Sequence, residues 1–151
     1  RPTTFLRGGD VERARSTWRP ADRRRSAAEG PRGLGDPAKA VVQFDAHQDT
    51  WADDGKRISH GSFVARAARE GIIDTKRSIQ IGIRTCAPED FGIKIVAGYE
   101  LEDMTAVQIA EVILKRVGDA KTYLTFDIDC LDPAFAPGTG TPVAGGPSSA
   151  G

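Results

Sequence analysis

Short apolar or alternating runs along residues 40–130 are separated by longer stretches with helical spacing. The short runs predict strands at residues 41–44, 78–84, 94–97 and 123–128. Helices are predicted from Ser62 to about Glu70 and from Asp103 to Val117, each followed by a glycine that can end it. Strands that alternate with helices of this length form parallel sheets covered on both faces. The sequence therefore predicts an α/β fold with three layers, in the order helix, parallel sheet, helix.

The second predicted helix has an apolar face of its own. Asp103 is the predicted N-cap, and Gly118 follows the last helical residue. Apolar side chains recur with helical spacing at Val107, Ala110, Leu114 and Val117. We therefore expect these four residues to share the face that covers the sheet.

Acidic residues follow two of the predicted strands. Asp45, His47 and Asp49 come after the apolar run at residues 41–44, and Asp127 and Asp129 lie at the end of the last strand. Because side chains repeat with period two in a strand, each group is expected on one face. Parallel strands end at one edge of their sheet, so the two groups should meet there. Carboxylates this close repel one another unless a cation lies between them.

These side chains offer four carboxylates and one imidazole as metal ligands. Hard oxygen donors with a single nitrogen suit Mn or Mg better than structural zinc, which favours Cys and His. Four carboxylates exceed what one divalent ion needs for neutralisation, which indicates two ions bridged by carboxylates and an activated water. An Asp-x-Asp pair alone is common in turns and caps, so the prediction depends on both groups together. Asp132, which precedes Pro133, is expected to fix a turn and not to bind metal.

Both acidic segments resemble motifs of the ureohydrolase superfamily, which comprises arginases, agmatinases and related amidinohydrolases. The motifs are DAHQD at residues 45–49 and FDIDCLDPAFAPGTGTPVAGG at residues 126–146, of which the second is most similar to agmatinases. HGSF from residue 60 and IQIGIRT from residue 79 also resemble the family. The resemblance covers about residues 40–146 and implies an arginase-like fold, here incomplete at both ends.

The resemblance implies a binuclear manganese site that hydrolyses a guanidinium C–N bond, with agmatine giving putrescine and urea in polyamine biosynthesis. The metal ligands that it implies are Asp45, His47, Asp49, Asp127 and Asp129. His60 occupies a position similar to the family's shuttle histidine, which implies that it gives a proton to the departing amine. Thr141 is expected to shape the loop near the site and is the one candidate for substrate contact. Arginine and 4-guanidinobutanoate remain alternative substrates, and a homo-oligomer is consistent with the family.

Two departures from the family leave a second interpretation open. Gly8, Gly9 and Asp10 resemble the start of a GGDH motif whose His binds the first metal, but Val11 follows here and cannot coordinate. A shifted reading frame up to about residue 39 would explain this. The chain also stops at Gly151, before the acidic residue that holds the guanidinium in the family. The alternative is therefore a noncatalytic fragment that binds at most one metal or a partner subunit.

Charge is balanced over the 151 residues, with 21 basic and 21 acidic side chains, but it is uneven along them. Residues 1–40 hold ten Arg or Lys against five Asp or Glu and few large apolar residues. Such a segment buries too little to offset its ordering entropy. We expect residues 1–39 to be a disordered or misread segment and residues 40–151 to form a partial ureohydrolase domain.

The remaining features exclude several partners and locations. The basic segment lacks aromatic interleaving and any nucleic-acid-binding motif, so no nucleic acid is expected. No apolar run approaches the roughly 18 residues of a membrane span, and no secretory signal pattern is present. Cys86 and Cys130 lie outside any CxxC pattern, which favours reduced thiols. A cytoplasmic protein that acts on a small guanidino substrate is the prediction.

Overall fold

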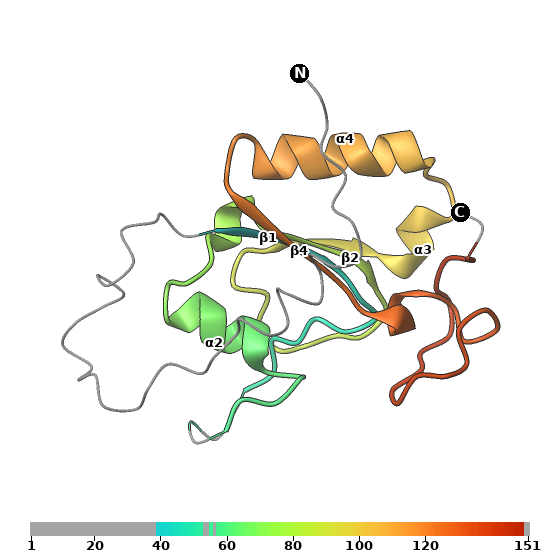
Figure 1. The fold of residues 1–151 in the computed structure, drawn as a ribbon, viewed down its shortest axis with the longest axis horizontal. Coiled ribbons are helices and arrows are strands. Elements are labelled where there is room, and N and C mark those ends of the chain that lie inside the picture. The colour runs from blue at the N-terminus through green and yellow to red at the C-terminus, as the bar shows by residue number, and fades with distance from the viewer. Residues whose placement is uncertain (1–38, 53–54, 56, 150–151) are drawn as a thin grey trace, which may run out of the picture. The chain divides into compact units, whose positions relative to one another are not determined.

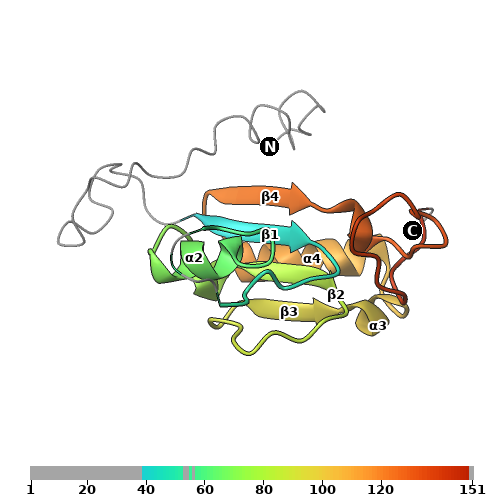
Figure 2. The same ribbon diagram turned by 90° about the horizontal axis from the view of Figure 1, so that it is seen from below.

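A computed structural model describes residues 39–52, 55 and 57–149. The expectations for the basic segment and for residues 8–11 lie outside these residues. The described chain forms a four-stranded parallel sheet in the order β3-β2-β1-β4 (Figures 1 and 2). The strands are β1 (Ala40–Phe44), β2 (Ile79–Ile83), β3 (Lys94–Ala97) and β4 (Thr122–Phe126). The predicted parallel sheet and α/β class are confirmed.

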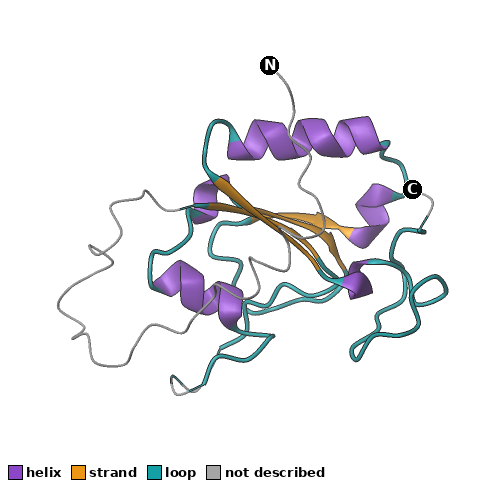
Figure 3. Ribbon diagram, in the orientation of Figure 1, coloured by secondary structure: helices purple, strands orange, loops and turns teal. Residues whose placement is uncertain are grey.

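Helices cover both faces of this sheet (Figure 3). Helix α4 (Ala106–Val117) lies on one face and α2 (Phe63–Arg69) on the other. Successive residues of β1 point to opposite faces of the sheet. Ala40 and Val42 belong to the core under α4, whereas Val41 packs with Val64 of α2. This division is the period-two pattern of a strand that is buried on both faces. The three predicted layers are therefore present.

The face that α4 buries differs from the predicted one. Ile109, Val112 and Ile113 pack against the sheet, while Val107 and Leu114 are 68% and 65% exposed. Of the four residues predicted to share the buried face, Val117 alone is buried in the core. Two apolar stripes run along this helix, and helical spacing alone does not decide which one faces the core. The stripe with the bulkier side chains is buried.

The predicted cap of α4 is also wrong, because the helix begins later than expected. Thr105 is the N-cap: its hydroxyl accepts from the backbone N–H of Gln108, whose side chain accepts from the N–H of Thr105. This reciprocal pair satisfies two N–H groups that would otherwise lack partners at the helix start. The end at Val117 is as predicted, since Gly118 follows with positive φ.

Helix α2 ends as its sequence predicts. Gly71 has a φ of +65°, and the N–H of Ile72 donates to the carbonyl of Ala67 at 2.9 Å. This turn provides a hydrogen-bond donor for a carbonyl group at the end of the helix, and glycine adopts the left-handed conformation that the turn needs without steric cost. Ser62 precedes the helix but makes no side-chain cap, because its Oγ accepts instead from the N–H of Ser59.

Three short elements escaped prediction: η1 (Thr75–Arg77), α3 (Gly98–Leu101) and η2 (Ile128–Cys130). The strand predicted over residues 123–128 ends at Phe126, and η2 replaces its last part. Single turns carry too few residues for a periodic signal, which explains why apolar spacing does not reveal them.

Strand β4 lies at one edge of the described sheet and pairs with β1. Its residues Leu124 and Phe126, and Ile128 beyond it, are about half exposed. Among the described residues, no helix has the length and apolar character needed to cross a bilayer. Neither Cys86, which is exposed, nor Cys130, which is buried, forms a disulfide in the described structure.

Candidate metal centre

The acidic segments meet at the edge of the sheet where all four strands end (Figure 2). Phe44 and Phe126 are in register as the last residues of β1 and β4, and their ring centroids are 5.7 Å apart. The next residues therefore leave the sheet at the same level. The N–H of Asp127 donates to the carbonyl of Phe44 at 2.8 Å, and the N–H of Ala46 donates to Oδ1 of Asp129 at 3.0 Å. These two bonds join the acidic segments directly.

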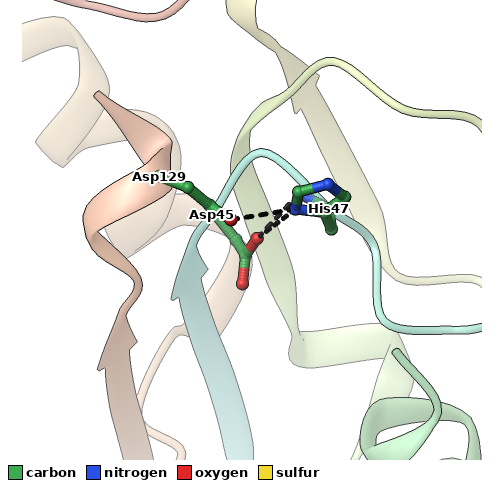
Figure 4. A group of neighbouring side chains, drawn as sticks. All are labelled: Asp45, His47 and Asp129. Carbon is green, nitrogen blue, oxygen red and sulfur yellow. Dashed lines mark hydrogen bonds and ion pairs between the residues drawn. The ribbon is translucent and has the colours of Figure 1, made fainter. Parts of the chain in front are cut away.

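Three of the predicted ligands come together as a compact group, which we call the acidic cluster: Asp45, His47 and Asp129 (Figure 4). One ligand atom from each lies within 4.8 Å of the others. Nδ1 of His47 is 3.0 Å from Oδ2 of Asp129 and 3.5 Å from Oδ1 of Asp45. Two carboxylates and an imidazole thus converge on one point.

The residues converge for a reason other than the predicted one. Neither acidic segment continues as a strand, so the period-two rule does not place these side chains. In each segment an aspartate carboxylate accepts the N–H two residues later: Oδ1 of Asp45 accepts from His47 at 2.7 Å, and Oδ1 of Asp127 accepts from Asp129 at 3.0 Å. Such turns are a common use of aspartate, because its short side chain reaches its own backbone. Both segments therefore curl back over the ends of their strands.

Asp49 and Asp127 lie beside the acidic cluster. Asp49 is buried in a left-handed backbone conformation, with a φ of +53°, and its carbonyl accepts from the N–H groups of Val64 and Ala65 in the first turn of α2. Asp127 is exposed and caps η2. The charge of Asp127 contributes to raising the pKa values of Asp45 and Asp49, and the charges of Asp45 and Asp129 contribute to raising that of Asp49. The structure thus places all five predicted ligands in one region and three of them in direct contact.

Burial makes this region electrostatically suited to a cation. Asp45, Asp49 and Asp129 are each less than 10% exposed. Loss of water, reinforced by the neighbouring carboxylates, raises the pKa values of Asp45 and Asp49 above the ordinary carboxyl range. The ion pairs that Asp45 and Asp129 form with described residues are with His47 alone. Buried carboxylates with a single imidazole fit a hard divalent ion, which would supply the missing positive charge.

The two other predicted site residues differ in their placement. The hydroxyl of Thr141 donates to Oδ2 of Asp129 at 3.2 Å, so the C-terminal loop reaches the acidic cluster. His60 is exposed in the turn that precedes α2. Within the described part of the chain, no hydrogen bond or ion pair joins its side chain to the acidic cluster.

The C-terminal loop is shaped by Asp132 in the way that its sequence predicts. Its carboxylate accepts from the N–H groups of Ala134, Gly145 and Gly146, which hold its pKa below the usual range. A Cβ on Gly146 would lie 2.5 Å from the carbonyl oxygen of Cys130, so only glycine allows this close return of the chain. Asp132 thus organises the loop that carries Thr141.

Arg84 is a residue to which the sequence assigned no role. Its guanidinium donates to the carbonyl oxygens of Gly82, Asp129, Cys130, Leu131 and Val143. It therefore ties the end of β2 to the segment that carries Asp129 and to the C-terminal loop. The sequence held a signal for this role. Arg84 is a long cationic side chain at the end of a buried strand, and the chain also contains a glycine-rich loop whose carbonyl groups need hydrogen-bond donors.

The sequence was compared with models of known protein families. Residues 4–150 match the Arginase family. The chain belongs to the arginase family. This confirms the resemblance carried by the two motifs, and the match begins early enough to include Gly8, Gly9 and Asp10.

Relatives that match this chain over about three quarters of its length are named agmatinases. An agmatinase from Cronobacter sakazakii is 51% identical over 110 residues, which are 73% of this chain and 36% of that protein. An agmatinase from Escherichia coli O1:K1 is 50% identical over the same shares. This chain therefore spans 36% of the length of the curated relatives that it matches.

Solved arginase-family structures share the fold. A hypothetical agmatinase from Burkholderia thailandensis superposes with a TM-score of 0.73 at 50% identity, covering 77% of this chain and 37% of that one. Proclavaminate amidino hydrolase from Streptomyces clavuligerus gives 0.69 at 40% identity, covering 75% and 40%. An arginase from Bacillus subtilis gives 0.63 at 26% identity, covering 74% and 46%. The predicted arginase-like architecture is confirmed.

Proposed function

We propose that this chain supplies the metal-binding edge of an agmatinase-like ureohydrolase, which hydrolyses agmatine to putrescine and urea. The observation that carries the proposal is the acidic cluster at the carboxyl edge of an arginase-family sheet. The relatives at about 50% identity that are named agmatinases support agmatine as the substrate. Arginine and 4-guanidinobutanoate are the competing substrates, and we further propose a cytoplasmic enzyme able to form homo-oligomers.

We propose Mn²⁺ as the bound metal, with two ions in the complete site. Asp45, His47 and Asp129 would hold one ion, and Asp49 and Asp127 would extend the ligand set toward the other. Oxygen donors with a single nitrogen favour such a hard ion over structural zinc. When bound, the ions would supply Lewis acidity, which makes water a nucleophile at neutral pH.

Two further side chains of this chain have proposed roles. The Thr141 hydroxyl, through its bond to Oδ2 of Asp129, would orient that carboxylate and line the substrate side of the loop. His60 would donate the proton that the departing amine needs, since imidazole titrates near neutrality. The N–H of Trp51 donates to the carbonyl of Gly61, and this bond anchors the turn of His60 beside the loop that follows Asp49.

A second function, noncatalytic binding of a single metal ion, also has an observation in its favour. Among the residues that the structure describes, three ligand groups meet in the acidic cluster, which is a set for one ion. Asp49 accepts a bond from the buried Gln43 amide, and Asp127 caps η2. In this alternative the chain binds one metal or a partner subunit and releases no urea.

Urea release from agmatine in the presence of Mn²⁺ distinguishes these functions. We expect the parent chain to release urea and an Asp127→Asn variant to lose at least about 100-fold of that activity, because a carboxylate of the site becomes neutral. Asp119→Asn makes the same charge change at an exposed pair with Arg77 and should keep the parent's rate. A parent that binds Mn²⁺ but releases no urea supports the noncatalytic function. Equal rates for the parent and Asp127→Asn would contradict the proposed site.

A further inference from the structure

Two glutamines lie inside the sheet behind the acidic cluster. Gln43 in β1 and Gln80 in β2 are each 1% exposed and are register partners in neighbouring strands. The other described positions of these two strands are hydrophobic or glycine. A buried amide is costly unless its polar atoms are hydrogen-bonded. Both polar atoms of the Gln43 amide and the nitrogen of the Gln80 amide have hydrogen-bond partners among the described residues, whereas Oε1 of Gln80 has none.

The amide of Gln43 connects two acidic residues of the site. Its Nε2 donates to Oδ2 of Asp45 at 2.8 Å and to Oδ2 of Asp49 at 3.1 Å. Both hydrogens of this one amide are thereby used on carboxylates. Since Oδ2 of Asp45 is held by Gln43, Oδ1 is the oxygen that faces Nδ1 of His47. Gln43 thus selects which oxygen of Asp45 is turned toward the acidic cluster.

Gln80 fixes the orientation of Gln43 from behind. Nε2 of Gln80 donates to Oε1 of Gln43 at 2.8 Å and also to the carbonyl of Gln48. If Gln80 were flipped, its Oε1 would face two acceptors and repel both. If Gln43 were flipped, its oxygen would face two carboxylates. Each amide therefore has one workable orientation, and the two orientations depend on each other.

We propose that Gln80 and Gln43 form an amide relay that positions Asp45 and Asp49 for metal binding, an inference that rests on the proposed metal centre. Both glutamines are positioning residues, because neither belongs to the three groups that meet in the acidic cluster. The neutral charge of the relay is part of its function. A lysine or arginine at the same place would neutralise the carboxylates and compete with the cation, whereas an amide holds their geometry and leaves their charge for the metal.

The relay predicts a graded loss of metal affinity, measured as free Mn²⁺ by electron paramagnetic resonance during titration of the 151-residue chain. Methionine has nearly the shape of glutamine without its polar atoms. Gln43→Met should weaken Mn²⁺ binding by about 10- to 100-fold, the range for partners of metal ligands. Gln80→Met touches neither carboxylate and should weaken binding about tenfold. The double variant should bind no more weakly than Gln43→Met, because Gln80 acts through Gln43.

Thermal unfolding of the metal-free chains separates positioning from stability. Ile81→Ala is the matched control, since Ile81 is next to Gln80 in β2 but packs in the core on the opposite face. It should lower the melting temperature and leave the Mn²⁺ affinity unchanged. Should Gln43→Met fail to fold, the affinity of Gln80→Met decides the matter.

The Mn²⁺ titrations can reject the relay without rejecting the proposed metal centre. A parent that binds Mn²⁺, with glutamine variants that bind it equally well, overturns the relay and leaves the proposed function standing. Fully additive losses in the double variant also overturn the relay, since they make the two amides independent. A parent that takes up no Mn²⁺ overturns the metal centre and the relay together.

Discussion

Replacement of Asp129 by Asn is expected to weaken Mn²⁺ binding by at least about 100-fold while the fold remains intact. Oδ1 of Asp129 accepts from the N–H of Ala46, and an amide oxygen can accept the same bond. Oδ2 faces His47 and the Thr141 hydroxyl, and there the variant loses the negative charge that attracts the ion. Titration of free Mn²⁺ measures the affinity, and circular dichroism checks the fold.

Asp119→Asn is the control for net charge, because it removes one negative charge from an exposed ion pair with Arg77, outside the acidic cluster. Its Mn²⁺ affinity should equal that of the parent. Equal weakening in both variants would mean that Mn²⁺ responds to overall charge. Parent-like binding by Asp129→Asn would remove Asp129 from the metal centre.

Arg84→Met is expected to lower the free energy of unfolding by about 3 kcal/mol and to weaken Mn²⁺ binding as well. The guanidinium of Arg84 is half-buried and donates to five backbone carbonyl groups, one of which belongs to Asp129. Methionine keeps the apolar stem and removes every donor. The freed carbonyl groups turn toward water, so the segment of Asp129 and the C-terminal loop lose their anchor. Urea unfolding and Mn²⁺ titration measure the two effects.

Arg116 offers a matched guanidinium away from the metal centre. It donates to the carbonyl oxygens of Thr75, Ser78 and Gly92, none of which belongs to the acidic segments. Arg116→Met should lose a similar stability and keep the parent's Mn²⁺ affinity. Arg84→Met could lower the stability and leave the Mn²⁺ affinity unchanged, which is the result expected for Arg116→Met. Arg84 would then be a structural anchor without influence on the metal centre.

The sequence predicted the centre of the sheet because β1 and β2 are buried, and burial leaves an apolar pattern in the sequence. Val41, Val42 and Phe44, or the alternating run at residues 79–83, allow few other structures once helices separate them. The meeting of Asp45 with Asp129 follows from the parallel order, since the ends of adjacent strands share an edge. The fold class and the edge of the sheet where the two acidic segments meet were therefore accessible from the sequence, whereas the sequence did not indicate which three of the five predicted ligands would form the acidic cluster.

Tertiary contacts decided what the sequence left open. Helix α4 has two apolar stripes, and only packing on the sheet selects Ile109 over Val107. The residues after β1 and β4 curl through side-chain bonds of Asp45 and Asp127, which spacing does not reveal. Arg84 and Gln80 act mainly through partners that are far away in the sequence, and Gln43 is held in place by the distant Gln80. A polar residue inside an apolar strand, as at Gln43, is the local sign of such a partner.

The most direct test of the metal centre is a crystal of the chain grown with Mn²⁺ and measured at the manganese absorption edge. We expect an anomalous peak among the side chains of Asp45, His47 and Asp129, with Oδ1 of Asp45 turned toward it. A chain that shows Mn²⁺ only at other carboxylates, with the acidic cluster unchanged, would contradict the proposed metal centre.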